Sequence, residues 1–249
     1  MTLTVDDQHL GTSEAAWLSS ERISLLRPLS LAPYRRVVIV APHPDDEVFG
    51  AAALLLSLES AEVQVVAVTD GEASHPDAAR QGYDLRVLRA QESARALYRL
   101  GWSHAPVSRL GLPDSAVTDH SDDLIEYLSE TLTPNDLCVA PWRHDGHPDH
   151  DACGRAAAEV AASKGAQLLE YLVWAWHWLE SDSSVLPWQR CSVLRLSRRQ
   201  AARKRWATHA FASQIRPLGL ELDQPSLLPT SVVRRFWRPF EVFIAAGPT

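Results

Sequence analysis

The stretch Arg36-Val-Val-Ile-Val-Ala41, followed at once by Pro42-His-Pro-Asp-Asp-Glu47, decides the fold of this 249-residue chain. A short run rich in β-branched residues predicts a strand that is buried on both faces, which is typical of a parallel sheet. The strand ends at His43-Pro44, where a loop opens, and a helix is expected from about Glu47. A buried strand, a polar loop and a helix form the repeating unit of α/β proteins.

The same alternation continues along the chain. Apolar and β-branched runs predict further strands at residues 63–69, 107–110, 137–140, 168–176 and 191–196 and near Val242. Helical spacing predicts helices at residues 84–100, 122–132, 149–163 and 198–209. This pattern indicates the α/β class, with a mostly parallel sheet covered on both faces. Sites in such folds lie at the C-terminal ends of the strands.

Composition and charge narrow the class of protein. The chain carries 24 Lys or Arg and 31 Asp or Glu, a net charge of −7, which disfavours a nucleic-acid partner. From Arg190 to the end, however, there are 11 basic and 3 acidic residues. Such asymmetry can indicate an anionic partner. We favour a basic segment that packs on the acidic body or in a subunit contact, so an oligomer is compatible with the sequence.

The sequence also predicts a cytoplasmic protein without a membrane span. The apolar run from Ala51 to Leu58 is far shorter than the ~18 residues that a spanning helix needs. Acidic residues near the N-terminus do not fit a secretory signal. The cysteines lack paired spacing, which is typical of buried thiols in a reducing compartment. They are Cys138, Cys153 and Cys191.

Most metal-competent side chains fall in two segments at strand-to-helix junctions. The first is the Pro42–Glu47 loop, where a tight turn would let His43 and Asp46 converge on one ion while Asp45 points to another side. The acidic residues of this segment could equally serve a helix N-terminus, so the segment alone is a weak signal.

The second segment is Asp145-Gly-His-Pro-Asp-His150. Pro148 suits the first turn of a helix, so His147 and His150 would fall on one face. If both loops follow neighbouring strands, His43, Asp46 and one of these histidines form a site with three N or O ligands and one open position. That arrangement is typical of a catalytic zinc. Six further histidines lack such company and are expected to be ordinary surface or core residues: His9, His75, His104, His120, His177 and His209.

Together the two segments resemble the signature motifs of the LmbE-like (PIG-L) zinc N-deacetylases: Pro42-His-Pro-Asp-Asp-Glu47 with Gly50, and Gly146-His-Pro-Asp-His150. Weaker matches extend the resemblance over most of the chain: Thr69-Asp-Gly-Glu72, Arg89 with Glu92 and Gly101, Leu112-Pro-Asp114, and Lys204 through His209 to Gln214. The resemblance implies a Rossmann-like three-layer fold. We expect a single domain over residues 1–249, with residues 1–30 as an N-terminal extension and residues 177–249 as a less regular part that completes the fold.

The resemblance also implies roles for individual residues. His43, Asp46 and His150 would bind the metal, Zn²⁺ by the family's pattern, although Fe²⁺ or another divalent metal would also fit. Asp45 would be the general base and His147 a second catalytic residue. In the sugar-thiol branch of the family a Tyr often precedes the first histidine of the second motif by two positions, but here Asp145 stands there. The substrate of that branch is therefore not carried over.

These roles predict hydrolysis of an amide. Asp45 would take a proton from the metal-activated water, and a protonated His147 would meet the charge that develops on the carbonyl oxygen. Asp149 or Asp145 would be the carboxylate that keeps His147 charged. The expected substrate is a small N-acetylglucosamine-like sugar or glycosylated metabolite, and the products are acetate and an amine.

Three alternatives stay open at this point. An amidase could use the same residues to cleave a larger acyl group or a thiol conjugate. Two histidines and one carboxylate are also the ligands of non-heme Fe(II) oxygenases. A base beside a ligand and alternating strands and helices argue against the oxygenase. A third alternative, a sugar-binding or scaffolding protein without turnover, is disfavoured by the full set of catalytic residues.

Two residues outside the motifs are candidates for substrate binding. Arg89 resembles an arginine that contacts substrate in the family, and Asp114 lies in a loop where it could accept sugar hydroxyls. The alternative for Arg89 is an ion pair with Glu92 on a helix surface. The C-terminal third is expected to supply part of the pocket wall, through Trp206, Trp237, Arg234 and Arg235.

Overall fold

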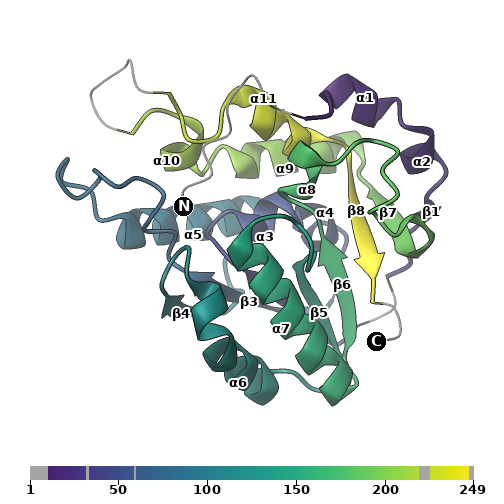
Figure 1. The fold of residues 1–249 in the computed structure, drawn as a ribbon, viewed down its shortest axis with the longest axis horizontal. Coiled ribbons are helices and arrows are strands. Elements are labelled where there is room, and N and C mark those ends of the chain that lie inside the picture. The colour runs from purple at the N-terminus through teal and green to yellow at the C-terminus, as the bar shows by residue number, and fades with distance from the viewer. Residues whose placement is uncertain (1–10, 32–33, 59, 219–224, 247–249) are drawn as a thin grey trace.

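The computed structural model describes residues 11–31, 34–58, 60–218 and 225–246 (Figure 1). Its centre is one sheet of eight strands in the order β1-β7-β8-β6-β5-β2-β3-β4. The strands are β1 (Arg27–Pro28), β2 (Arg36–Ala41), β3 (Glu62–Thr69), β4 (Val107–Leu112), β5 (Asp136–Pro141), β6 (Gln167–Tyr171), β7 (Cys191–Arg195) and β8 (Phe240–Ala245).

Helices connect the strands and cover the sheet. The α-helices are α1 (Glu14–Leu18), α2 (Glu21–Ser24), α3 (Asp46–Phe49), α4 (Ala52–Leu55), α5 (Leu85–Leu100), α6 (Ser121–Thr131), α7 (Pro148–Lys164), α8 (Ala175–Trp178), α9 (Arg198–Thr208), α10 (Ala212–Ile215) and α11 (Thr230–Val233). The short 3₁₀ helices are η2 (Val117–His120), η3 (Trp188–Arg190) and η4 (Arg234–Trp237).

The sheet is parallel except for β8, which runs antiparallel to both of its neighbours, β6 and β7. From β2 the chain adds β3 and β4 on one side, and it then returns to add β5 and β6 on the other. The order therefore reverses between β2 and β5. In open α/β sheets, ligands bind at such a switch point, outside the C-terminal ends of the strands.

Both faces of β2 are buried, as its sequence predicts. Val37, Ile39 and Ala41 belong to one apolar cluster, which includes residues of α4, α5 and α9. Val38 and Val40 belong to a second cluster, formed with α6 and α7 on the opposite face. The α/β class and the mostly parallel, three-layer sheet are thus confirmed.

One predicted strand is too long. The run 168–176 was expected to be extended, but β6 ends at Tyr171 and α8 begins at Ala175. The reason is Asp145, whose carboxylate accepts hydrogen bonds from the backbone N–H groups of Val173, Trp174 and Ala175. These bonds turn the chain out of the sheet.

The N-terminal segment packs onto the sheet instead of projecting from it. β1 pairs with β7 as an edge strand. Trp17 of α1 is fully buried and its indole N–H donates to the carbonyl of Trp176. Glu14 pairs with Arg238, just before β8. The basic C-terminal part thus meets an acidic residue of this segment, in line with the packing interpretation of the charge asymmetry.

The structure can be compared with two predictions, the absence of a membrane span and the burial of the cysteines. In the described ranges no helix combines the length and the apolar character needed to cross a membrane. All three cysteines are buried and unpaired, as expected: Cys138, Cys153 and Cys191.

Candidate metal centre and active site

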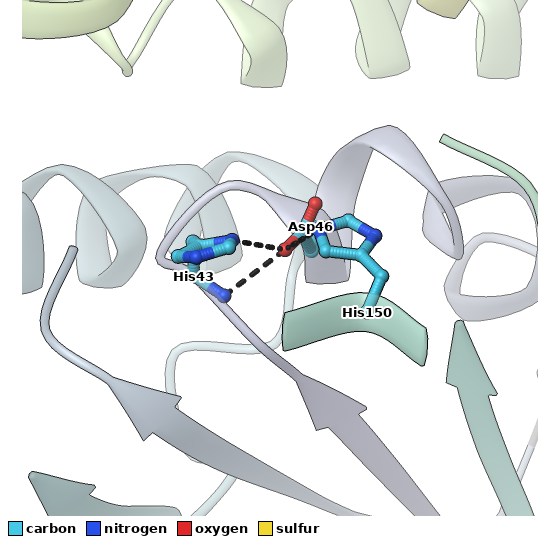
Figure 2. A group of neighbouring side chains, drawn as sticks. All are labelled: His43, Asp46 and His150. Carbon is cyan, nitrogen blue, oxygen red and sulfur yellow. Dashed lines mark hydrogen bonds and ion pairs between the residues drawn. The ribbon is translucent and has the colours of Figure 1, made fainter. Parts of the chain in front are cut away.

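Three side chains from the two motif segments meet beyond the C-terminal ends of β2 and β5: His43 in the loop after β2, Asp46 at the start of α3 and His150 in the first turn of α7 (Figure 2). Because β2 and β5 are paired neighbours, the loops that follow them lie side by side. Nδ1 of His43 lies 3.3 Å from Oδ2 of Asp46, and Nε2 of His150 lies 3.2 Å from the same oxygen. One ligand atom from each residue falls within 4.8 Å of the others. The structure therefore contains a His/Asp/His group able to bind a metal, formed by the three residues predicted as ligands.

The two histidines are held by carboxylates on their far sides. Nδ1 of His150 lies 2.9 Å from Oδ2 of Asp145, and Nε2 of His43 lies 3.1 Å from Oδ2 of Asp149. When these nitrogens carry the ring protons, Nε2 of His150 and Nδ1 of His43 present lone pairs to the group. Carboxylates in this position fix the orientation of metal-binding histidines and raise their basicity.

The donor set fits a divalent cation. Nε2 of His150 is buried and finds no hydrogen-bond partner among the described residues, although it faces Asp46. Burial by itself would lower the pKa of His150, but Asp46 and Asp145 raise it to about 9. Burial by itself would raise the pKa of Asp46, but His150 and His43 hold it far below its usual value. A cation bound here takes the place of the histidine proton, because only neutral imidazole ligates metals. Two nitrogens and one oxygen are ligands typical of zinc sites that keep an open position.

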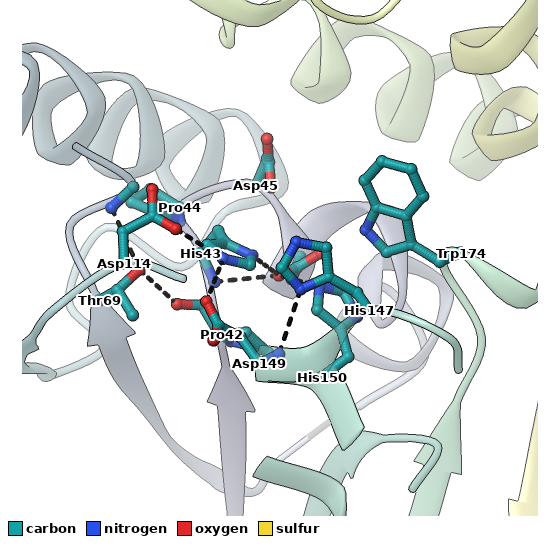
Figure 3. A network of polar contacts seen from close by, with 12 residues as sticks. Pro42, His43, Pro44, Asp45, Thr69, Asp114, His147, Asp149, His150 and Trp174 are labelled. Carbon is teal, nitrogen blue, oxygen red and sulfur yellow. Dashed lines mark hydrogen bonds and ion pairs between the residues drawn. The ribbon is translucent and has the colours of Figure 1, made fainter. Parts of the chain in front are cut away.

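Asp45 stands apart from this group, as predicted. Asp45 has a φ of 145°, and its carboxylate points away from the labelled rings of His43 and His150 (Figure 3). Its backbone N–H donates to Oε2 of Glu47, and its Oδ2 accepts a hydrogen bond of 3.1 Å from Nη2 of Arg89. Burial raises the pKa of Asp45 to about 8, against the effect of Arg89. A cation at the neighbouring group would lower this pKa again.

His147 is the N-cap residue of α7 and lines the same pocket. Nδ1 of His147 accepts the backbone N–H of Asp149, so a neutral ring carries its proton on Nε2. Burial, together with His150 and His43, lowers the pKa of His147 to about 3. The described side chains thus favour a neutral His147, where the sequence had predicted a protonated one.

The carboxylates predicted to keep His147 charged have other partners. Asp145 binds His150 and three backbone amides, and Asp149 binds His43 and the amides of Ser115 and Val117. Asp149 still raises the pKa of His147, but burial, His150 and His43 lower it by more, so the role expected of Asp145 or Asp149 at His147 stays a prediction. The positions of Asp145 and Asp149 in the sequence could not show which histidine each carboxylate contacts. The sharp turns of the two motif segments determine these contacts.

The alternative considered for Arg89, an ion pair with Glu92 on a helix surface, is wrong. Arg89 is 3% exposed, and besides Asp45 it donates to the carbonyl oxygens of Gly71 and Pro44. Glu92 points elsewhere and accepts hydrogen bonds from Ser213. Oδ1 of Asp114, the other candidate, lies 3.3 Å from Nε2 of His43. Both Arg89 and Asp114 line the pocket, so a substrate role for each stays a prediction.

The pocket in front of the metal group measures about 750 Å³, including the space at its open mouth. Its aromatic wall comes from Trp174, His177 and Phe236. The residues expected there lie elsewhere. Trp206 is 53% exposed under Arg99, Trp237 packs against Arg205, and Arg235 binds backbone carbonyls; none of the three, nor Arg234, lines the pocket.

Trp174 and His177 were missed by the sequence analysis. His177 was expected to be an ordinary histidine, and Trp174 was placed inside a strand. A signal was present, because both residues follow a strand of the parallel sheet, where functional side chains gather. Ending β6 at Tyr171 would have placed them at the rim of the site.

Comparison with known proteins agrees with this geometry. A family model described as GlcNAc-PI de-N-acetylase, PIG-L, matches residues 38–161. The matched stretch contains both motif loops and the whole metal-capable group. The chain belongs to the PIG-L family.

Two curated proteins are similar to about half of this PIG-L chain. A probable N-acetyl-α-D-glucosaminyl L-malate deacetylase 2 of Bacillus subtilis (strain 168) is 31% identical over 138 residues, which cover 51% of the chain and 61% of that protein. A diacetylchitobiose deacetylase of Thermococcus kodakarensis is 25% identical over 135 residues, which cover 53% of the chain and 51% of that protein. The chain thus spans about half to three-fifths of the length of these relatives.

Among solved structures, a deacetylase of the A40926 pseudoaglycone superposes with a TM-score of 0.61 at 23% identity. The match covers 87% of this chain and 100% of that chain. At this level of identity the similarity shows the shared fold.

Proposed function

We propose that this PIG-L protein is a metal-dependent hydrolase that removes the N-acetyl group from a small molecule containing N-acetylglucosamine. The observation that carries the proposal is the position of Asp45, whose carboxylate lines the pocket without joining the His/Asp/His group (Figure 3). A base beside a metal is what amide hydrolysis needs. The family description and the names of the relatives support the same reaction.

A divalent metal in this group would lower the pKa of a water molecule and polarise the amide carbonyl. Asp45 would accept the proton of the attacking water and return it to the amine nitrogen as the C–N bond breaks. His147, neutral and protonated on Nε2, would donate a hydrogen bond to the carbonyl oxygen as its charge develops. Asp145 would hold His150 in place, and Arg89 would orient Asp45.

We propose Zn²⁺ as the metal, since two imidazoles and a carboxylate with an open position suit it. The same ligands would hold Fe²⁺. The mostly parallel α/β sheet and the proposed general base, Asp45, both disfavour the oxygenase alternative. The amidase alternative would use the same residues and differs only in the acyl group that leaves.

The polar side of the pocket suits a sugar. Asp114, Ser115 and Ser74 line it and offer groups for hydroxyl hydrogen bonds. We infer that the partner is a small N-acetylated sugar or glycosylated metabolite, not a nucleic acid, and that an oligomer is compatible with the chain. The unpaired cysteines fit a cytoplasmic location.

The test is acetate release by the zinc-loaded protein from a panel of N-acetylated sugars, nucleotide sugars and glycosylated metabolites. Asp45→Asn should retain the metal and lose roughly 10²-fold or more in kcat, as expected for loss of a general base. Asp182→Asn, at an exposed position outside the pocket, is the matched control and should be unchanged. A metal-loaded Asp45→Asn protein with near-normal turnover would refute the assignment.

A further inference from the structure

The pocket in front of the metal-capable group has two unlike sides. One side is polar and comes from the segments after β3 and β4, including Ser74 and Asp114. The other side is apolar. In Figure 3, Asp114 and Trp174 lie on opposite sides of the histidines. We call the apolar side the acyl wall, and define it by residues from four segments: Phe49, Trp174, His177, Leu228, Val232 and Phe236.

The acyl wall is continuous with the reacting centre. The ring of His147 lies 5.5 Å from that of Trp174, which lies 5.8 Å from the ring of His177. His177 in turn lies 6.1 Å from Phe236, which stacks on Phe49 at 4.4 Å. A row of rings therefore runs from the candidate catalytic histidine to helix α3, next to Asp46.

The acyl wall also carries no formal charge. Burial lowers the pKa of His177 to about 3, with Arg235 and Arg238 adding to the effect, so its ring is neutral at physiological pH. Polar hydroxyls of a sugar would find few partners along this side. Contiguous apolar surface of this kind marks a place where an apolar ligand binds.

The geometry of an amide links the two sides. Its carbonyl carbon bears the nitrogen on one side and the acyl carbon on the other, so a sugar held by the polar side directs the acyl group toward the acyl wall. An acetyl group would cover only a small part of that wall. We propose that the acyl wall binds aliphatic acyl chains longer than acetyl, and that N-acyl amino sugars with such chains are substrates at least as good as N-acetyl ones.

The inference rests on the proposed function and keeps its chemistry. The amide C–N bond breaks, the water oxygen goes to the acyl carbon, and a proton goes to the amine nitrogen. The products are a medium-chain carboxylate in place of acetate and the same free amine.

The first experiment compares N-acetyl-, N-butanoyl- and N-hexanoylglucosamine with the metal-loaded wild-type protein, by detection of the free amine. Each buried methylene should raise kcat/KM by about fourfold, from the transfer free energy of a CH₂ group. A kcat/KM for the butanoyl sugar at or above that of the acetyl sugar supports the proposal. A lower value for the butanoyl sugar overturns it.

The second experiment fills the acyl wall. Leu228 is partly exposed at the wall, and its backbone N–H donates to Gln214, which holds the segment in place. Leu228→Trp should lower the ratio of kcat/KM for the hexanoyl sugar to kcat/KM for the acetyl sugar at least tenfold. Leu18→Trp, a matched change at a side chain 57% exposed on α1, should alter neither. Equal losses on both sugars in Leu228→Trp would contradict the acyl wall.

A binding measurement separates this inference from the proposed function. If no N-acyl sugar is hydrolysed, the deacetylase proposal itself fails. The acyl wall is then tested by quenching of tryptophan fluorescence with acetate, butanoate and hexanoate. The Kd should fall about 15-fold from acetate to butanoate and further to hexanoate, and this trend should disappear in Leu228→Trp. A Kd independent of chain length would refute the inference alone.

Discussion

At the scale of single residues, the site depends on how Asp45 is held. Its φ of 145° is rare for a residue with a side chain and costs about 1–3 kcal/mol. The hydrogen bond to Glu47 and the ion pair with Arg89 offset this cost. Glu47 is itself fixed by Ser93, which donates to its other carboxylate oxygen. The strain thus separates Asp45 from Asp46, so that two adjacent carboxylates can take different roles.

Arg89 should therefore set the pH dependence of the reaction. Burial raises the pKa of Asp45 and the charge of Arg89 lowers it. In Arg89→Met the pKa of Asp45 rises, a smaller fraction is ionised at a given pH, and the acidic limb of the kcat/KM profile moves to higher pH. Arg89→Lys keeps the charge and should shift the limb less. The measurement is a pH–rate profile of the metal-loaded variants.

A folding control is part of this prediction, because Arg89 also binds two backbone carbonyls. Thermal unfolding should show that both variants are folded at the assay temperature. If a folded Arg89→Met protein keeps the acidic limb of the wild type, Arg89 does not act on the base. A mere loss of stability would not move that limb.

Much of this site could be predicted from the sequence. The rest depends on contacts between distant segments, which the spacing of residues in the sequence does not show. His43, Asp46 and His150 meet because two motifs follow paired strands, which a strand pattern can foresee. The partners of Asp145 and Asp149 could not be foreseen, since they depend on backbone turns that bring chain segments together across the sheet. The contact of Arg89 with Asp45 was not foreseen for the same reason.

At the scale of elements, helix α7 packs closely against the end of β5. A Cβ built on Gly154 would lie 2.5 Å from the carbonyl oxygen of Pro141 and 2.7 Å from the backbone of Arg143. The same helix carries His150 in its first turn. Gly154 therefore allows the approach that places His150 over the group.

Gly154→Ala should destabilise the protein by about 1–3 kcal/mol, because backbone atoms cannot move aside as a side chain can. Helix propensity alone predicts the opposite, a gain of about 1 kcal/mol for alanine inside a helix. Urea unfolding gives the sign directly. A stabilised variant would show that the contact relaxes at little cost.

The sequence predicted the strands and helices well where long regular elements form the sheet or pack against it. Predicted boundaries such as 84–100 agree with α5, whose N-cap Asp84 accepts the backbone N–H of Arg86. The error came at β6, where a side chain from another loop ends an apolar strand. Short elements such as α8 and α11 have too few residues to show a period, so packing decides them.

At the scale of the whole molecule, the two ends of the described chain are tied together. Arg238 donates through Nε and Nη2 to both carboxylate oxygens of Glu14, at 2.8 and 2.6 Å. Its guanidinium lies 4.4 Å from the ring of Trp176, whose carbonyl accepts the indole N–H of Trp17. The segment before β8 and helix α1 thus pack together at Trp176, two residues after Trp174 of the acyl wall.

Glu14→Gln should lower the free energy of unfolding by about 2 kcal/mol, because a charge-assisted, two-pronged hydrogen bond is lost and Arg238 stays buried. Glu21→Gln is the matched control. Glu21 is exposed and also stands in the first turn of a short helix, so any effect on the helix dipole is common to both variants.

The measurement is urea unfolding at low and high salt. The difference between the variants should persist at high salt, since Arg238 is 3% exposed and poorly screened. A difference below about 0.5 kcal/mol, as for an ordinary surface ion pair, would show that the N-terminal segment is not fastened by this contact.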